Sequence, residues 1–286
     1  SNIPSAAIGA AGSRDAIGGV GTVIVEGGYV FAFSDKGTAI GGGSSASRPG
    51  GKGEITISGG VVIAKSGNEN SAGIGGGSSY TDNVNENDDG NNGDGVKKGK
   101  GKANGGDATI TISGTPIIRT GSIGGGSPGK GTGKIGSATI EIKGGDIQAQ
   151  FVMAASDNNV FNMQGGLIRN SDTSDDEYKC IQENGGAVYM QKGTFTMSGG
   201  TIKKCSASKG GAVYIEGDEN TEFTMEGGTI QGCEASGDGG AVYLKMGKVS
   251  LKGGIIKENV SHNGNGGAIC VLGGDFTMDG GQVTFN

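Results

Sequence analysis

A double glycine that follows a short alternating strand recurs along the chain and constrains its fold more than any other feature. One copy is degenerate, ITISGT ending at Thr115, and successive copies lie 21 to 34 residues apart, with one gap of 55. The complete copies (TVIVEGG, EITISGG, ATIEIKGG, VFNMQGG, FTMSGG, FTMEGG, VSLKGG and FTMDGG) end at Gly28, Gly60, Gly145, Gly166, Gly200, Gly228, Gly254 and Gly281. Self-similarity at such a period is typical of a solenoid, in which each repeat forms one turn.

A second kind of strand lies between these motifs. It reads GGAVYM, GGAVYI, GGAVYL and GGAICV in the C-terminal half, and TAIGGG, AGIGGG and SIGGG in the N-terminal half. The chain holds 26 Ile and 17 Val but only 4 Leu, a bias that favours strands over helices. We therefore expect an all-β, single-stranded right-handed parallel β-helix of about nine coils, with the handedness taken from the general bias of parallel crossovers.

The same repeats set the expected domain organisation. Residues 1–286 form one β-helix domain in this interpretation, and 81–106 form a flexible loop insertion. The pattern is still running at the final GGQVTFN, which predicts that the chain is a fragment of a larger protein. Most of the 65 glycines fall at coil corners, where a positive φ or a close approach between coils leaves no room for a Cβ.

Strand alternation predicts which side chains fill the core. The inward pairs are Ile55/Ile57, Ile110/Ile112, Ile140/Ile142, Phe161/Met163, Phe195/Met197, Phe223/Met225, Val249/Leu251 and Phe276/Met278. After the double glycine, one further inward residue follows in the later repeats, namely Ile202, Ile230, Ile256 and Val283. The residue between the members of each pair points outward, usually Thr or Ser, with Glu141 and Asn162 as exceptions.

Charge and hydropathy exclude two classes of partner. The net charge is -6 with a pI near 4.9, so the chain offers no basic field for a nucleic-acid backbone. No apolar stretch approaches the roughly 18 to 20 residues that a membrane-spanning helix requires. We expect neither nucleic-acid binding nor membrane insertion within this chain.

The GGAVY, GGAVY, GGAVY, GGAIC series resembles the repeats of polymorphic outer-membrane proteins and of other bacterial surface proteins with pectin-lyase-like right-handed β-helices. The FxxN element of the polymorphic proteins is nearly absent. The IGGG and TISGG repeats of the N-terminal half are more similar to those of large cell-wall proteins from Gram-positive gut and rumen anaerobes. The resemblance implies a secreted or surface-displayed protein and implies no particular activity.

Pectin-lyase-like folds include lyases and glycosidases, which need clustered carboxylates and a basic or acidic partner. No such set emerges from the outward positions. Glu141 is isolated among Thr and Ser, the single histidine, His262, lies in a turn, and Asp175, Asp176 and Glu177 form a charge run in a loop insertion. We predict that the chain is not an enzyme. A polysaccharide lyase or glycosidase is the alternative.

The insertion at 81–106 is the one candidate metal site. From Asn85 onward, the ligand positions of an EF-hand-like loop include Asn87 and Asp89, but the twelfth position is Val96 where a bidentate Glu is required. A hydrated loop without cofactor is therefore expected, and Ca²⁺ in the 82–95 loop is the alternative. We expect deletion of 82–103 to be tolerated.

The GGAVY strands place Tyr189, Tyr214 and Tyr243 outward in one column, because the flanking apolar residues face inward. Three stacked tyrosines suit a platform for sugar rings or a partner protein. A purely structural ladder of stacked rings is the alternative. The outward threonines also raise the hypothesis of a flat ice-binding face, which Glu141 and Asn162 interrupt.

The repeat frame also aligns the cysteines. Cys205 and Cys233 occupy the same position after the double glycine on successive coils, and Cys180 aligns with Cys205 when counted back from GGAVY. Adjacent coils about 4.8 Å apart allow a disulfide. A Cys205–Cys233 bridge and a stack of buried thiols are both open, and Cys270 replaces the next tyrosine of the column.

These observations favour an extracellular, cell-surface structural or adhesive module that presents a repetitive lateral face to glycans or to a host or microbial surface protein. A passive stalk without a ligand is the remaining possibility beside the enzyme.

Overall fold

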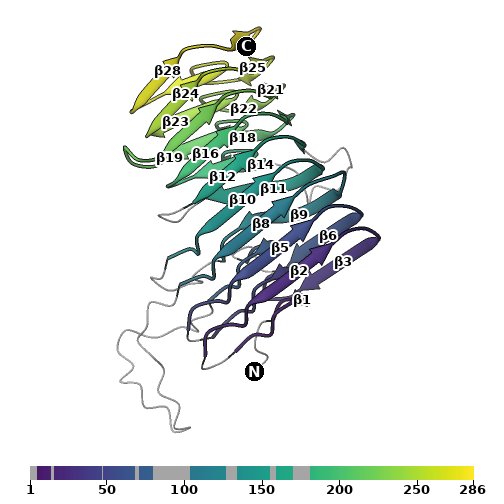
Figure 1. Cartoon of the computed structure of the whole chain (residues 1–286). Helices are drawn as coiled ribbons and strands as arrows, with labels where there is room; N and C mark the ends of the chain where they lie inside the picture. Colours follow the sequence, from purple (N-terminus) through teal and green to yellow (C-terminus); the bar gives the residue numbers. More distant parts are fainter. Residues whose placement is uncertain are drawn as a thin grey trace, which may run out of the picture.

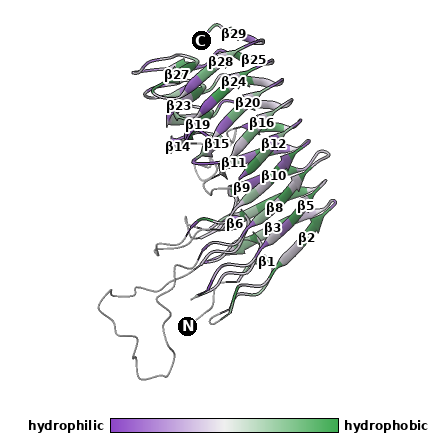
Figure 2. Ribbon diagram, turned by 60° about the vertical axis from the view of Figure 1, so that its left-hand side comes forward, coloured by the Kyte–Doolittle hydropathy of each residue, from purple (hydrophilic) through white to green (hydrophobic). Residues whose placement is uncertain are grey.

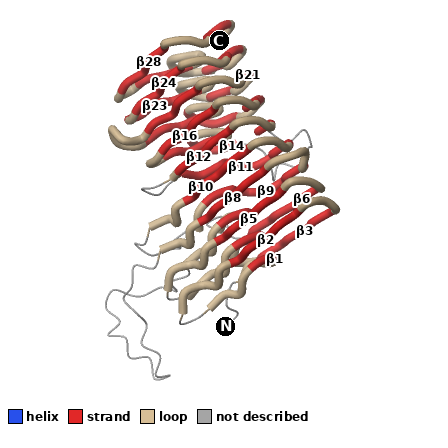
Figure 3. Tube along the Cα trace, in the orientation of Figure 1, coloured by secondary structure: helices blue, strands red, loops and turns tan. Residues whose placement is uncertain are grey.

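The computed structural model describes residues 5–13, 16–46, 48–67, 71–79, 104–126, 134–154, 159–169 and 181–286. Within these ranges all regular secondary structure is β-strand, as the colouring of Figure 3 shows. The strands are stacked in sequence order, so the two termini lie at opposite ends of the stack (Figure 1). Neighbouring strands pair in parallel.

The strands that precede the double-glycine motifs form a nine-stranded sheet, here called the first row. They are paired in sequence order, so every copy of the motif lies beside the next copy. The first row consists of β2 (Gly21–Val25), β5 (Gly53–Ile57), β8 (Ala108–Ile112), β10 (Ala138–Ile142), β12 (Val160–Met163), β16 (Thr194–Met197), β20 (Glu222–Met225), β24 (Lys248–Leu251) and β28 (Asp275–Met278).

The strands that follow the motifs form the second row. It consists of β3 (Tyr29–Ser34), β6 (Val61–Ser66), β9 (Ile117–Gly124), β11 (Asp146–Ala154), β13 (Leu167–Arg169), β17 (Thr201–Lys203), β21 (Thr229–Gln231), β25 (Ile255–Lys257) and β29 (Gln282–Thr284).

A third row belongs to the same 16-stranded sheet, because the long strands β9 and β11 extend across both rows. Its other members are β1 (Ile8–Gly9), β4 (Ile40–Gly41), β7 (Ile74–Gly75), β15 (Val188–Met190), β19 (Val213–Glu216), β23 (Val242–Met246) and β27 (Ile269–Val271). A separate four-stranded sheet contains β14 (Ile181–Asn184), β18 (Ser206–Lys209), β22 (Glu234–Ala235) and β26 (Val260–Ser261).

The predicted inward pairs form continuous columns in the core. Phe161, Phe195 and Phe223 are paired in register and fully buried, and their ring centroids lie 4.4 and 4.6 Å apart in near-parallel stacks. Buried and more exposed positions alternate along β12 and β16. Figure 2 shows green, hydrophobic segments on the stacked strands. Phe276 and Met278 occupy the predicted inward positions, in register with Val249 and Leu251, but they are not buried as predicted. They remain 36% and 48% exposed because β28 pairs with β24 alone.

The second glycine of each complete motif has a left-handed backbone, as expected for a coil corner. Its φ lies between +77° and +87° at Gly28, Gly60, Gly145, Gly166, Gly200, Gly228, Gly254 and Gly281. A residue with a Cβ is strained at such angles, so the repeated glycine turns the chain from the first row into the second.

In the N-terminal half, each coil brings two of its own backbone segments into direct contact, with no side chains between them. A zigzag of seven backbone hydrogen bonds, 2.7 to 3.1 Å long, links Ala11, Gly19, Gly43, Gly51, Gly77, Gly106, Gly126 and Gly136, and each glycine donates its N–H to the carbonyl of the residue before it in this series. We call this ladder the glycine net. A Cβ built on Gly43, Gly77 or Gly126 would lie well inside contact distance of the carbonyl one coil below. Close backbone approach therefore explains the IGGG repeats.

Candidate functional site

The predicted tyrosine column exists, and its rings cover one another. Tyr189, Tyr214 and Tyr243 are in register on β15, β19 and β23, with centroid distances of 5.5 and 5.3 Å and interplanar angles of 22° and 7°. Tyr214 and Tyr243 are only 4% and 2% exposed, yet neither belongs to the central apolar cluster that contains the flanking Val213 and Ile215. The column thus lies outside the core but offers little ring surface to a ligand.

The hydroxyl groups of the column are also engaged. Tyr189 and Tyr214 both donate to Glu216 Oε2, at 3.4 and 3.2 Å, and Gln191 donates to the Tyr189 oxygen at 2.8 Å. Glu216 forms an ion pair with Lys245, whose ammonium lowers the pKa of that carboxyl. Burial and the Glu216 carboxylate raise the pKa of Tyr214.

This network favours a structural ladder as the geometry of the column. Register also places Cys270 directly beside Tyr243 in place of the next tyrosine, as predicted. Ligand binding by these three tyrosines stays a prediction, and a ligand would meet mainly ring edges.

Two of the predicted cysteines are buried in one corner of the coils. The Sγ of Cys205 donates to the Lys203 carbonyl at 3.5 Å, and the Sγ of Cys233 donates to the Gln231 carbonyl at 3.6 Å. Cys233 carries a thiol in this structure, so the Cys205–Cys233 bridge stays a prediction for the oxidised protein. Cys180 lies outside the described residues.

The column of Cys205 and Cys233 continues into asparagines, which the sequence reading missed. Asn259 Oδ1 accepts from the Cys233 backbone N–H at 2.9 Å, and Asn259 Nδ2 donates to Asn286 Oδ1 at 2.8 Å. Counting five residues past each double glycine would have found them.

The isolated polar residues considered for catalysis lie in separate surface pairs. His262 Nε2 is 3.1 Å from Glu234 Oε2, with both side chains more than half exposed, and Glu141 is ion-paired with Lys143 at 2.8 Å. Asp175, Asp176, Glu177 and the 82–95 loop lie outside the described residues. In the part of the chain that the structure describes, no group of three or more His, Cys, Asp or Glu side chains could hold a metal ion.

Two surface hollows are open rather than enclosed. One, of about 490 Å³, lies beside the glycine net and is lined in part by Ile17, Val20 and Lys52. The other, of about 370 Å³, is lined in part by Asp218 and Lys248. Over the described ranges, no helix has the length and apolarity to cross a bilayer.

The outward face of the second row carries an exposed aromatic surface that the sequence reading missed. Tyr29, Phe31 and Phe33 on β3 are 68%, 61% and 50% exposed, and Val30, Ala32 and Ser34 between them face inward. Register places Val61 and Ile63 of β6 beside Tyr29 and Phe31, and Ile117 of β9 extends the apolar surface. We call Tyr29, Phe31, Phe33, Val61, Ile63 and Ile117 the aromatic face. The alternation in YVFAFS is the signal that would have revealed it.

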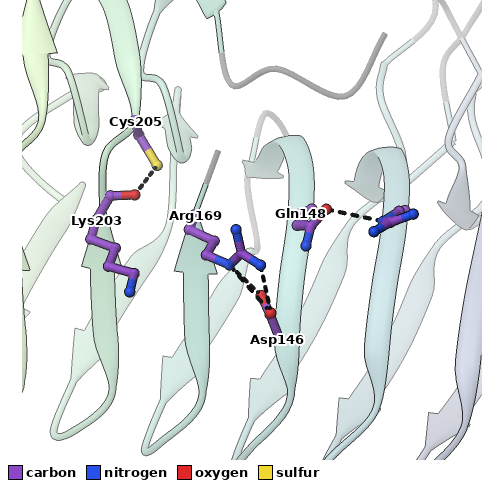
Figure 4. Close-up of polar contacts among 6 residues, drawn as sticks. Asp146, Gln148, Arg169, Lys203 and Cys205 are labelled. Carbon is purple, nitrogen blue, oxygen red and sulfur yellow. Dashed lines mark hydrogen bonds and ion pairs between the residues drawn. The ribbon is translucent and has the colours of Figure 1, made fainter. Parts of the chain in front are cut away.

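The same face becomes cationic and polar further along the stack. The residues in register with Phe31 on the next three strands are Ile63, Arg119 and Gln148. The equivalent outward positions of β13, β17, β21 and β25 hold Arg169, Lys203, Gln231 and Lys257. Arg119 Nε donates to Gln148 Oε1 at 3.1 Å. Figure 4 shows Gln148, Arg169 and Lys203 on adjacent strands.

No protein-family model, no curated protein and no solved structure matches this chain.

Proposed function

We propose that the chain is a right-handed parallel β-helix of about nine coils and serves as a structural or adhesive module of an extracellular bacterial surface protein. Its lateral face would bind glycans or a partner protein. The in-register parallel rows support the solenoid, the general bias of parallel crossovers supports the handedness, and the resemblance of the GGAVY and IGGG repeats to those of pectin-lyase-like surface proteins supports the location.

The observation that carries the binding role is the aromatic face. Exposed contiguous apolar surfaces on soluble proteins mark interaction sites, and aromatic rings supply much contact area with few rotatable bonds. The three side chains of β3 stand about 6.8 Å apart along one strand, because every second residue shares a face. They project away from the sheet, so coils added before β3 would pair with its edge and leave the rings uncovered.

A flat row of rings suits an extended ligand better than a small one. A sugar ring presents an apolar face of C–H groups that can lie on an aromatic ring, with its hydroxyls directed to the sides. This geometry supports a glycan as the ligand and a partner protein as the second candidate.

The competing function is a carbohydrate-active enzyme. It requires a proton acceptor and a charge-stabilising group near one reacting atom. His262 with Glu234 and Glu141 with Lys143 form pairs outside the second row. Asp146, which lies beside Ile117 of the aromatic face, is held in an ion pair by Arg169. This arrangement supports binding without cleavage.

The proposal is tested by applying the purified chain to a glycan array and to columns of immobilised polysaccharide. Retention that disappears in the Phe31→Ala/Phe33→Ala variant supports it. Leu272→Ala, which removes an apolar residue that is 69% exposed elsewhere, is the control and should bind normally. Release of unsaturated fragments that absorb ultraviolet light would instead show a lyase. Silence on every glycan and every surface extract would show a passive stalk and overturn the proposal.

A further inference from the structure

The outward face of the second row carries mainly positive charge, although the chain as a whole is acidic. Within the strands of this row, Asp146 is the one outward carboxylate among the described residues, against Arg119, Arg169, Lys203 and Lys257 in a single column and Lys65 nearby. The outward positions of the first row carry both signs instead, as Glu54, Glu141, Glu222, Lys248 and Asp275. A net charge of -6 makes this segregation informative.

The column contains the same arrangement twice, a cation, an amide and a cation on three successive strands. The first triplet is Arg119, Gln148 and Arg169, and the second is Lys203, Gln231 and Lys257. Strands about 4.8 Å apart place the two cations of each triplet about 10 Å from each other.

The first triplet already holds a carboxylate of the chain itself. Arg169 Nε and Nη2 donate to the two oxygens of Asp146 at 3.0 to 3.2 Å, and the Arg169 side chain is 15% exposed (Figure 4). Gln148 is buried, 2% exposed, and accepts from Arg119. This triplet shows how the column binds a carboxylate from the side.

The second triplet has no such internal carboxylate. Thr201, Thr229 and Ile255 occupy the positions on β17, β21 and β25 that correspond to Asp146. Lys203 has no ion pair with any described residue. Lys257 has only a loose pair with Glu258, 3.5 Å apart and with side chains 33% and 52% exposed. Such exposed pairs contribute little to stability, and the lysine is readily available to another anion.

We propose that the outward face of the second row binds a linear acidic polysaccharide in which carboxylated and neutral sugars alternate. This inference rests on the proposed function and names its ligand class. The polysaccharide lies along the stack, with sugar rings on the aromatic face and carboxylates on Lys203 and Lys257. Gln231, between the two lysines, bonds to hydroxyls of the intervening neutral sugar.

The spacing of the column supports this ligand. Each coil advances about 4.8 Å, close to the length of one pyranose unit, so alternate sugars meet alternate strands. Duplex DNA, by contrast, carries a charge about every 1.7 Å, a density that the column does not match. Phe31 and Ile63 lie in the same column as the cations, so one extended chain can contact both parts.

The test measures the affinity of the folded chain for hyaluronan, a polymer in which every second sugar carries a carboxylate, by calorimetry in about 0.1 M salt. Carboxyl-reduced hyaluronan keeps the backbone and removes the charge, so its binding should be at least tenfold weaker. Lys203→Glu/Lys257→Glu should also weaken hyaluronan binding at least tenfold, which corresponds to about 1.4 kcal/mol.

The matched control is Lys248→Glu/Lys252→Glu, which makes the same change in net charge on exposed lysines in and beside the first row. It should bind within a factor of about two of the unmodified chain, since exposed charges beyond a screening length of about 10 Å interact weakly at 0.1 M salt. If the glutamate pair unfolds the protein, Lys203→Gln/Lys257→Gln removes both charges with less perturbation and should show the same direction of change.

The inference would be overturned if native and carboxyl-reduced hyaluronan bound equally well. It would also be overturned if Lys203→Glu/Lys257→Glu and Lys248→Glu/Lys252→Glu lost the same affinity for hyaluronan, or if a single-stranded nucleic acid bound as tightly as hyaluronan. Absence of hyaluronan binding would overturn it as well. The proposed function is separable from this outcome, because retention of a neutral glycan that depends on Phe31 and Phe33 would sustain the binding module while excluding the acidic ligand.

Discussion

Replacing Gly106 with alanine tests whether the glycine net holds the N-terminal half together. Gly106 is buried, donates to the Gly77 carbonyl at 2.7 Å and accepts from Gly126 N–H at 2.8 Å. An added Cβ would lie closer to the Gly51 carbonyl than the 3.0 Å that real Cβ atoms keep. The backbone must therefore move apart, since no flexible side chain is present to yield.

The size of the effect follows from the hydrogen bonds that this movement breaks. A buried backbone group left without a partner costs about 1–3 kcal/mol, so the loss of two hydrogen bonds of the glycine net costs about 2–6 kcal/mol. The entropy that alanine removes from the unfolded chain returns only about 0.4–1 kcal/mol. A net loss of about 1–5 kcal/mol is expected. Each kcal/mol lowers the melting temperature of a chain of 150–250 residues by about 2–4 °C.

Thermal unfolding followed by circular dichroism measures this loss, with Gly27→Ala as the control. Gly27 is exposed, and a Cβ there would meet nothing within 4 Å, so this variant should be unchanged or slightly more stable. A Gly106→Ala protein that melts with the unmodified chain would refute the argument that close backbone approach requires these glycines.

Truncating Phe195→Ala in the middle of the buried phenylalanine stack should lower the free energy of unfolding by about 3–5 kcal/mol in urea titrations, and a loss below 1 kcal/mol would contradict the packing. Because the pKa of Tyr214 is raised above 10.0, the unfolded chain loses its phenolic proton first. Stability should therefore fall as pH rises above about 10, and less steeply in Tyr214→Phe. Deleting 82–103 should leave the melting temperature nearly unchanged, with or without a chelator; a large fall would show a structural or Ca²⁺-binding loop. Thiol titration of the unfolded, unreduced protein should detect two free thiols among the four cysteines if Cys205 and Cys233 form a disulfide, whereas four free thiols would exclude the bridge.

Much of the fold could be predicted because each coil repeats the same order of strand, double glycine and inward side chains. Alternation placed Phe195 and Met197 in the core, and the recurring double glycine gave the strand order of the first row. The parallel stacked strands were predicted in the same way. These features depend only on period and on side-chain polarity, both of which a single sequence displays.

The candidate site was harder to predict because outward positions differ from coil to coil. Tyr214 was expected at an outward position, and neighbouring rings together with Glu216 enclose it there, which alternation alone cannot show. Lys203 and Lys257 are 54 residues apart in sequence and look like ordinary surface lysines. Only register reveals that one strand lies between them, with Gln231 at the equivalent position.

The glycine net also has a consequence for the heat capacity of unfolding. Exposure of apolar surface raises this heat capacity by about 0.45 cal/mol/K per Å², whereas exposure of polar surface lowers it by about 0.26. Unfolding of the net exposes peptide groups, while unfolding of the Phe161, Phe195 and Phe223 stack exposes aromatic carbon. The coils that carry the net should therefore have a flatter curve of stability against temperature than the coils that follow them, and should lose less of their stability on cooling.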